Sequence, residues 1–461
     1  MLHRIASTLL IAAAFTFALA AQTPTWKAEL IGTPDPAWST TAAVAVNDAG
    51  TAVGITYLSG YQRAWVAAPG QGMSLLPIPA GATFSRPYDL DSDGVVAGSV
   101  LLESGISRGV LWRPSPSGYV MELIPASPNG HEPFDARGIN DRGDVVGKLG
   151  ILGGSYYWNE AEGTVQMTWS VFPKVPAAIN ERRQIVADSV RMDLDTMLLE
   201  QLGNPTGTTY NYQWTELSHI NDAGQCTGYA VTATSGWPYL PVRYSDGPQW
   251  NVFSNFPLNA AGAGGLSATG DTVFQLGIYG TYLWVDGVGS LGIQGLLDPA
   301  YAHFSVAGSF LPAISRGNRL ACNGLDTSTG QGGIVLLTPL AFEDLGGAAA
   351  GALGDPVLTA YGSLLPGEPV RVRLASAAPG GVAIVALSAT SSVVPLFGGT
   401  FHANPALVFL GVPVDGMGRF DMSADWPSVP AGTTVYMQVG MADAEAAHGF
   451  SLSNALEAVT R

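Results

Sequence analysis

The 461-residue chain has little cysteine, little lysine and little charge of either sign. It contains two cysteines, three lysines and only 12% charged residues. Acids outnumber bases by 36 to 20, which gives a formal net charge of -16. A chain with this charge repels a phosphate backbone, so nucleic acid and anionic membranes are poor partners on electrostatic grounds.

Long apolar runs are also missing after the first 20 residues, where no stretch approaches the roughly 18 apolar residues of a transmembrane helix. We therefore expect no membrane span in the mature chain. The N-terminal stretch has a basic start at Arg4, apolar residues over 5–20 and small residues before Ala21. This order is typical of a signal peptide over residues 1–21, so we expect a secreted, extracellular or periplasmic protein, with cell-surface association left open. An uncleaved anchor is the rival interpretation.

The chain does contain one short sequence motif, which recurs seven times between residues 43 and 321. Each copy has an apolar residue, a small polar residue, a turn and an apolar pair that is often closed by glycine. The small polar positions are Asn47, Asp91, Asn140, Asn180, Asn221, Ser267 and Ser315. The turns end at Gly50, Gly94, Gly143, Arg183, Gly224, Gly270 and Asn318. A side-chain oxygen at the first position can accept a backbone N–H two residues on, and glycine at the last position adopts positive φ without strain. Asn318 is a reasonable substitute there, but Arg183 is not, so the fourth copy is the weakest.

The spacing of these turns, 40 to 49 residues, is close to that of a four-stranded propeller blade. The sequence therefore predicts an all-β fold with a seven-bladed β-propeller over residues 22–340. The seventh copy has no fourth strand after residues 332–338, whereas residues 26–31 are an unpaired strand candidate before the first copy. We expect this N-terminal segment to complete the last blade, because closure protects exposed strand edges. An open solenoid and an irregular six-bladed ring are the alternatives.

Glycines and aromatic residues also recur at fixed places in the copies. Glycine after the apolar pair predicts close backbone approach between sheets, at Gly54, Gly98, Gly147 and Gly228. The third strand carries an aromatic residue in five copies, namely Trp65, Trp112, Trp158, Tyr244 and Trp284. Leu199 and Leu336 stand there in the other two copies. These side chains could line a ligand channel, but packed sheets need large apolar groups, so core packing is favoured.

The pattern Ile-Asn-Asp-x-Gly-x-Val-Val-Gly, followed by a strand with tryptophan, resembles the HAF repeat family of bacterial extracellular repeat proteins. The His-Ala-Phe run that names the family is degenerate here, since Arg63-Ala64-Trp65 and Gly109-Val110-Leu111-Trp112 stand in its place. The resemblance covers residues 25–339. It implies a secreted, propeller-like fold and carries over no catalytic residue.

After residue 341 the repeat disappears. Alternating apolar residues over 370–374, 382–387, 418–422 and 434–441 predict a small antiparallel β-sandwich over residues 341–461. The ending Leu452-Ser453-Asn454-Ala455-Leu456 resembles a C-terminal module found on many secreted bacterial proteins.

Three sets of residues resemble catalytic or metal-binding motifs, but a purely structural role explains each of them better. Gly105-Ile106-Ser107-Arg108-Gly109 matches a nucleophile elbow, but a strand rather than a helix is expected after it. Asp89, Asp91 and Asp93 resemble the start of a calcium loop, but they lack the downstream acid and align with the other turns, so a simple turn is favoured and calcium binding stays open. The histidines form no spaced pair that suggests zinc, and His219 is predicted to end a strand rather than to act as a base. The histidines after the expected signal peptide are His131, His219, His303, His402 and His448.

Cys226 and Cys322 are predicted to be free thiols. Export permits a disulfide, but the two cysteines stand at different places in repeats that are not neighbours, and a disulfide needs Cα atoms within about 7 Å.

The sequence thus supplies no catalytic, cofactor-binding or metal-binding set. It favours a monomeric, secreted, non-catalytic binding protein, with an extracellular glycan or protein as ligand and a C-terminal module for attachment or sorting. An extracellular hydrolase or lyase acting on polysaccharide or ester bonds is the alternative, because a propeller can gather acids from several blades. A purely structural envelope protein is a third possibility.

Overall fold

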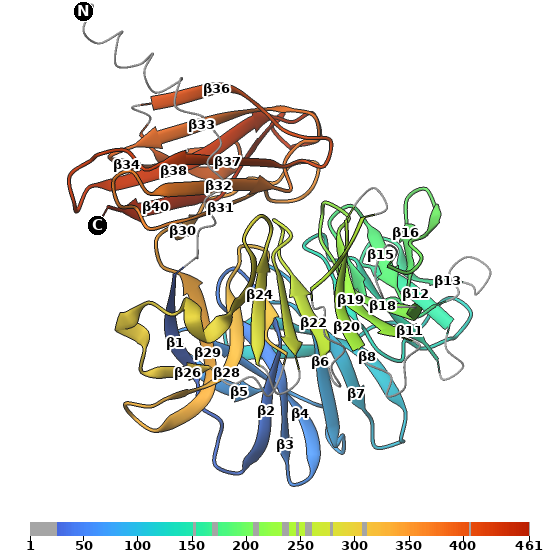
Figure 1. The fold of residues 1–461 in the computed structure, drawn as a ribbon. Helices are drawn as coiled ribbons and strands as arrows, with labels where there is room; N and C mark the ends of the chain where they lie inside the picture. Colours follow the sequence, from blue (N-terminus) through green and yellow to red (C-terminus); the bar gives the residue numbers. More distant parts are fainter. Residues whose placement is uncertain are drawn as a thin grey trace, which may run out of the picture. The chain divides into compact units, whose positions relative to one another are not determined.

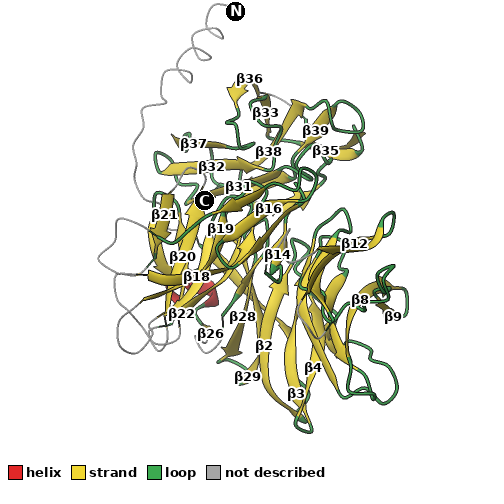
Figure 2. Cartoon of the chain, turned by 90° about the vertical axis from the view of Figure 1, so that its right-hand side faces the viewer, coloured by secondary structure: helices red, strands yellow, loops and turns green. Residues whose placement is uncertain are grey.

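The protein is all-β in the computed structural model (Figure 1). The structure describes residues 25–150, 154–167, 174–205, 212–232, 239–245, 249–253, 261–276, 280–306, 311–404 and 407–460. The expected signal peptide lies outside these ranges. Helical structure in the described residues consists of the 3₁₀ turns η2 (Ile293–Leu296) and η3 (Pro299–Tyr301), and strands joined by loops account for the rest of the regular structure (Figure 2). No helix in these ranges has the length and hydrophobicity needed to cross a membrane.

The chain divides into two compact units. The larger one, called here the repeat unit, comprises Ala28–Val285 and Ser290–Thr338. The smaller one, called here the C-terminal unit, comprises Pro339–Arg461 with the residues before Ala28 and Asp286–Gly289.

Seven antiparallel sheets make up the described part of the repeat unit, and six of them have four strands each. The first two sheets are β2 (Trp38–Val46), β3 (Ala52–Leu58), β4 (Tyr61–Ala68) and β5 (Gly72–Leu75), then β6 (Phe84–Leu90), β7 (Val96–Leu101), β8 (Ser107–Ser115) and β9 (Gly118–Leu123). The third and fourth are β10 (Gly138–Ile139), β11 (Val145–Leu149), β12 (Gly154–Asn159) and β13 (Gly163–Met167), then β14 (Ala178–Ile179), β15 (Gln184–Ala187), β16 (Val190–Asp193) and β17 (Leu199–Gln201). The fifth and sixth are β18 (Tyr212–Ile220), β19 (Cys226–Thr232), β20 (Tyr239–Ser245) and β21 (Gln249–Val252), then β22 (Ala261–Leu266), β23 (Thr272–Leu276), β24 (Thr281–Val285) and β25 (Gly289–Gly292).

The seventh sheet joins the two ends of the repeat unit. Its order is β1 (Trp26–Gly32), β29 (Gln331–Pro339), β28 (Leu320–Asp326) and β26 (Phe304–Val306), and β27 (Ala313–Ile314) also pairs with β28. The N-terminal strand therefore lies beside β29, which confirms that the beginning of the chain completes the last sheet.

The first strands of successive sheets contact one another around a closed circuit. The contacts run from β2 to β6, β10, β14, β18, β22 and β27, and β27 in turn contacts β2. Every sheet of the repeat unit therefore has a neighbour on both sides, which an open solenoid would not provide.

The seven motif turns adopt one geometry. In each, the side-chain oxygen of the small polar residue accepts the backbone N–H four residues on, from Thr51, Val95, Asp144, Gln184, Gln225, Asp271 and Arg319. The predicted acceptance of an N–H two residues on occurs in addition at Asn140 and Asn180. All seven predicted turn ends have positive φ, from 57° at Arg183 to 88° at Gly270.

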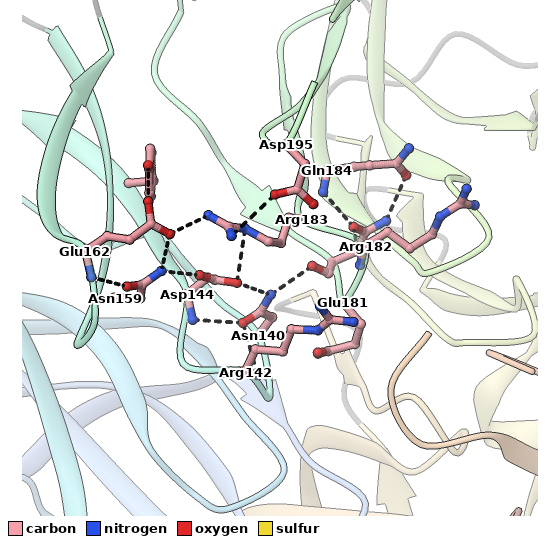
Figure 3. Close-up of polar contacts among 12 residues, drawn as sticks. Asn140, Arg142, Asp144, Asn159, Glu162, Glu181, Arg182, Arg183, Gln184 and Asp195 are labelled. Carbon is pink, nitrogen blue, oxygen red and sulfur yellow. Dashed lines mark hydrogen bonds and ion pairs between the residues drawn. The ribbon is translucent and has the colours of Figure 1, made fainter. Parts of the chain in front are cut away.

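Arg183 is the exception in residue type but not in conformation, so the expectation that arginine would not fit this turn is wrong. Its guanidinium contacts Glu162 at 3.1 Å, Asp195 at 3.3 Å and Asp144 at 3.6 Å (Figure 3). It also lies over the ring of Tyr157. These contacts offset the strain of a left-handed backbone at a residue with a Cβ.

The glycines after the apolar pairs do permit a close approach, but within one sheet rather than between sheets. A Cβ on Gly54 would lie 2.0 Å from the carbonyl oxygen of Ala42, and one on Gly228 would lie 1.9 Å from that of Glu216. Both oxygens belong to the adjacent strand of the same sheet, where the pairing register is interrupted by a bulge. The bulge turns the backbone of one strand toward the other, so only glycine fits.

The core of the repeat unit lies between neighbouring sheets. One cluster combines Val53 of the first sheet with Val96 and Trp112 of the second, and another combines Trp65 of the first with Leu336 of the seventh. Trp65 and Trp112 are fully buried, which confirms the core interpretation for these aromatic residues.

The C-terminal unit contains a six-stranded and a three-stranded sheet that share one core. The larger sheet is β30 (Glu343–Gly346), β40 (Ala455–Val459), β38 (Thr434–Ala442), β33 (Val382–Ser388) and β36 (Leu407–Pro413), with β39 (Phe450–Leu452) paired to β38. The smaller sheet is β31 (Val357–Gly362), β32 (Pro369–Ala375) and β37 (Phe420–Asp425), and β34 (Ser391–Leu396) and β35 (Gly399–Ala403) form a hairpin. Val439 and Leu374 represent the two sheets in the shared apolar cluster. Asn454 fixes the last strand, because its side chain accepts from the Leu358 N–H and donates to the Leu358 carbonyl.

Candidate functional site: the carboxylates of the motif turns

The second position of the motif turns gathers charged side chains at one end of the seven sheets. These positions are Asp48, Ser92, Asp141, Glu181, Asp222, Ala268 and Arg316. Because the turns are equivalent and each sheet contacts the next, side chains at this position come together although they are distant in sequence.

Each carboxylate in this set accepts the N–H of the preceding turn. Asp141 accepts from Ser92 at 2.8 Å, Glu181 from Asp141 at 2.8 Å and Asp222 from Glu181 at 2.9 Å. Asp48 accepts from Gly317 at 2.6 Å, which links the seventh turn to the first across 269 residues. These side chains therefore link each turn to its neighbour by a hydrogen bond.

The asparagine side chains at the first position of the motif turns form a second set of hydrogen bonds between neighbouring turns. The Nδ2 of Asn47, Asn140, Asn180 and Asn221 donates to a backbone carbonyl of the following turn, and Figure 3 shows the surroundings of Asn140. Asn47, Asn140 and Asn221 thus occupy like environments, as the repeat requires.

Arg316 is the cation at the centre of this set. Its two terminal nitrogens each donate at 2.7 Å, one to Asp141 and the other to Asp222, although these residues are 81 positions apart in the chain. About a quarter of the Arg316 side chain is exposed, at 26%, whereas that of Asp222 is 6% exposed. The carboxylates of Asp222, Asp141, Glu181 and Asp48 together raise the pKa of Arg316 above its usual value, against the opposing effect of burial.

Glu181 is the carboxyl with the most perturbed protonation in this set. Burial, and then the negative charges of Asp222 and Asp141, raise its pKa to about 8, while Arg316 acts in the opposite direction. Its Oε1 accepts the Asp141 N–H, and its Oε2 is buried with no hydrogen-bond partner among the described residues. At neutral pH the Glu181 side chain is therefore mostly protonated.

The calcium-loop candidate is a motif turn. Asp91 uses its Oδ1 to accept the Val95 N–H, and Asp89 accepts from Leu90 and from Ile139 of the next sheet. Burial raises the pKa of Asp89 to about 7 and that of Asp91 to about 6. In the described ranges no three His, Cys, Asp or Glu side chains are grouped in a way that could hold a metal ion.

The nucleophile-elbow candidate is part of a hairpin. Ser107 begins strand β8 and donates its hydroxyl to the Phe134 carbonyl at 3.0 Å, so no helix follows it. His219 lies in the last two residues of β18, as predicted, and its Nδ1 contacts the Ser218 hydroxyl. Burial lowers the pKa of His219 to about 4.

Cys226 and Cys322 are both buried and are not joined in a disulfide, as the sequence predicted.

Sequence reasoning missed Arg316 and Glu181. The available signal was the second motif position, which is acidic in four of the seven copies and basic in one. Chemically, the arrangement can hold the turns together, and it can also present the protonated carboxyl of Glu181.

No protein-family model and no curated protein matches the chain. Among solved structures, it is similar to a sialidase from Trypanosoma rangeli with 9% identity, a TM-score of 0.30, and coverage of 96% of this chain and 95% of the other. It is also similar to the β-propeller domain of the Trilobed protease from Pyrococcus furiosus, with 12% identity, a TM-score of 0.28, and coverage of 73% and 92%. TolB from Acinetobacter baumannii has 11% identity, a TM-score of 0.26, and coverage of 80% of each chain. At these TM-scores the likeness supports no inference about chemistry.

Proposed function

We propose that this chain is a secreted, non-catalytic binding protein of the HAF-repeat type. In this proposal residues 22–340 form a seven-bladed β-propeller that presents a loop-built face to an extracellular glycan or protein. Residues 341–461 form a β-sandwich that serves attachment or sorting. Seven sheets in a closed circuit of contacts, with the N-terminal strand in the last sheet, support the propeller assignment.

The observation that supports the binding role is that the clustered carboxyl groups are occupied by structural hydrogen bonds and ion pairs. One side-chain oxygen accepts the backbone N–H of a neighbouring turn in each of Asp48, Asp141, Glu181 and Asp222. The other oxygen of Asp141 and of Asp222 accepts a hydrogen bond from Arg316. Groups that are committed to backbone and ion-pair contacts hold a rigid scaffold, and loops on such a scaffold are where recognition usually resides.

One observation favours the alternative of a hydrolase. Burial raises the pKa of Glu181 to about 8, so this carboxyl is mostly protonated at neutral pH, and enzymes use a protonated carboxyl of this kind as a general acid. The buried, unpartnered Oε2 of Glu181 is the atom from which a proton would be donated.

The replacement Glu181→Gln separates the two functions. The amide keeps an oxygen for the Asp141 N–H and cannot supply a proton, so we expect this variant to fold and to capture ligands from an array of neutral and acidic glycans as the wild type does. We also expect neither protein to release product from a panel of polysaccharides and aryl esters.

The control is Glu160→Gln, which alters a side chain that is 76% exposed and distant from the motif turns in sequence. Product release by the wild type and by Glu160→Gln, with a loss of 100-fold or more in Glu181→Gln, would refute the binding role and establish catalysis, because general acid catalysis contributes roughly 10²- to 10⁴-fold.

A further inference from the structure

Two arginines share one aromatic ring in the second and third sheets. Arg86 and Tyr88 lie on β6, and Arg137 immediately precedes β10. The guanidinium carbons of Arg86 and Arg137 lie 5.0 Å and 5.9 Å from the centre of the Tyr88 ring. The two strands are in contact, and the hydrogen bond from the Ile139 N–H to Asp89 at 3.0 Å ties them together.

These two cations are incompletely neutralised, which is unusual in a chain with 36 acids and 20 bases. Arg86 is exposed, and its guanidinium has no ion pair or hydrogen bond within the described ranges. Arg137 contacts Asp135 through Nε at 3.0 Å, and its two terminal nitrogens have no partner in the same ranges. Two guanidinium groups beside one ring repel each other unless an anion lies between them.

The groups around the pair are held in place by the fold. The Asp135 side chain is 2% exposed and accepts the Lys148 N–H at 2.8 Å, so it fixes the Nε end of Arg137. Burial, and then the negative charge of Asp135, raise the pKa of Tyr88, so its hydroxyl stays neutral between the two cations. The ring lies on β6, which the hydrogen bond between Asp89 and Ile139 ties to β10, so a ligand would meet a largely preformed site.

We propose that Arg86 and Arg137 form a binding subsite for a small ligand that carries a single carboxylate group. A guanidinium presents paired N–H donors that match the two oxygens of a carboxylate, and both arginines retain unused donors. The net charge of -16 opposes polyanions and dianions more strongly than a monoanion, so a carboxylate is favoured over a phosphate and a short ligand over a polymer. This inference rests on the proposed binding function and assigns part of its specificity.

The test is calorimetric titration of the full chain at low salt with galacturonate, acetate and galactose. We expect galacturonate to bind, galactose to give no measurable heat, and raised salt to weaken galacturonate binding because exposed charges are screened. Binding of acetate as well would identify the carboxylate alone as the recognised group, whereas binding of galacturonate alone would place the carboxylate on an acidic sugar. Both results support the subsite.

The replacement Arg86→Ala is the decisive variant, since this exposed side chain makes no ion pair that its loss would break. We expect its Kd for galacturonate to rise roughly tenfold or more, as loss of a hydrogen bond to a charged group predicts. Arg137→Gln should have a similar effect. Arg113→Ala, which removes the same charge from an arginine already paired to Glu122 and Glu160, should leave the Kd unchanged.

An unchanged Kd in Arg86→Ala, equal affinity for galactose, or no binding of either acid at about 10 mM by the wild type would each overturn the subsite. Failure of the proposed binding function is measured in a separate experiment. It would appear as release of product by the wild type that is lost in Glu181→Gln.

Discussion

Replacement of Arg316 by methionine is expected to lower the free energy of unfolding of the repeat unit by about 2–4 kcal/mol at pH 7. The change keeps most of the aliphatic volume but leaves Asp141 and Asp222 without the cation that bridges them at 2.7 Å. Breaking a buried ion pair costs more than this, and partial exposure of the Arg316 side chain reduces the cost because solvent screens the remaining charges. Chemical denaturation followed by tryptophan fluorescence measures the loss.

The matched control for this variant is Arg113→Met on β8, because Arg113 also pairs with two carboxyl side chains but both of those are more than half exposed, so we expect a change within about 0.5 kcal/mol. Equal stability of Arg316→Met and wild type at pH 7 would contradict a structural role for Arg316.

Stability is expected to fall as pH rises from 6.5 to 8.5, by about 2–3 kcal/mol. The pKa of Glu181 is raised from 4.5 to about 8 and that of Asp89 from 3.8 to about 7. Between the unfolded and folded values, the folded state holds a proton that the unfolded state has released. Rising pH therefore favours unfolding through this window, and the stabilisation is lost once the folded-state pKa is passed.

His219 acts in the opposite direction but below this window. Its pKa is lowered from 6.5 to about 4, so the folded state binds fewer protons between these values and stability rises with pH there. At pH 6.5 the unfolded imidazole is still half protonated, so between pH 6.5 and pH 8.5 His219 contributes a rise of only about 0.4 kcal/mol, well below the fall expected from the carboxyls.

The control for the pH effect is Glu181→Gln, which cannot ionise and should lose about two thirds of the fall, whereas Glu160→Gln should retain all of it. Thermal unfolding at the two pH values measures the difference. A wild type that is as stable at pH 8.5 as at pH 6.5 would contradict the protonated state assigned to Glu181 and Asp89.

The motif turns could be predicted from the sequence because their chemistry is local. Gly50 and Asn318 end turns that require positive φ, and both have it. The pairing of residues 26–31 with the last sheet was also predictable, since a strand candidate stood unpaired at one end and a strand was missing at the other. The strands over 370–374 and 434–441 follow from alternation and are present as β32 and β38.

The remaining features depend on contacts between repeats, which a single sequence does not reveal. Arg183 adopts a conformation that its residue type disfavours because Asp144 and Glu162 from the preceding sheet hold its side chain. Gly228 faces the adjacent strand of its own sheet because a bulge turns the Glu216 carbonyl toward it. Arg316 meets Asp141 and Asp222 only because the seven turns converge, and turn chemistry alone does not show which side chains then meet.

Hydrogen exchange of the motif-turn amides tests most directly whether the repeat unit is one closed ring in which neighbouring turns are linked by hydrogen bonds. The relevant N–H groups are those of Thr51, Val95, Asp144, Gln184, Gln225, Asp271 and Arg319. In a closed ring no turn is terminal, so all seven amides should be protected to a similar degree and should lose protection together in denaturant. Early exchange at Thr51 and Arg319, with protection rising toward the middle turns, would show an open array with free ends and would contradict the Asp48–Gly317 closure.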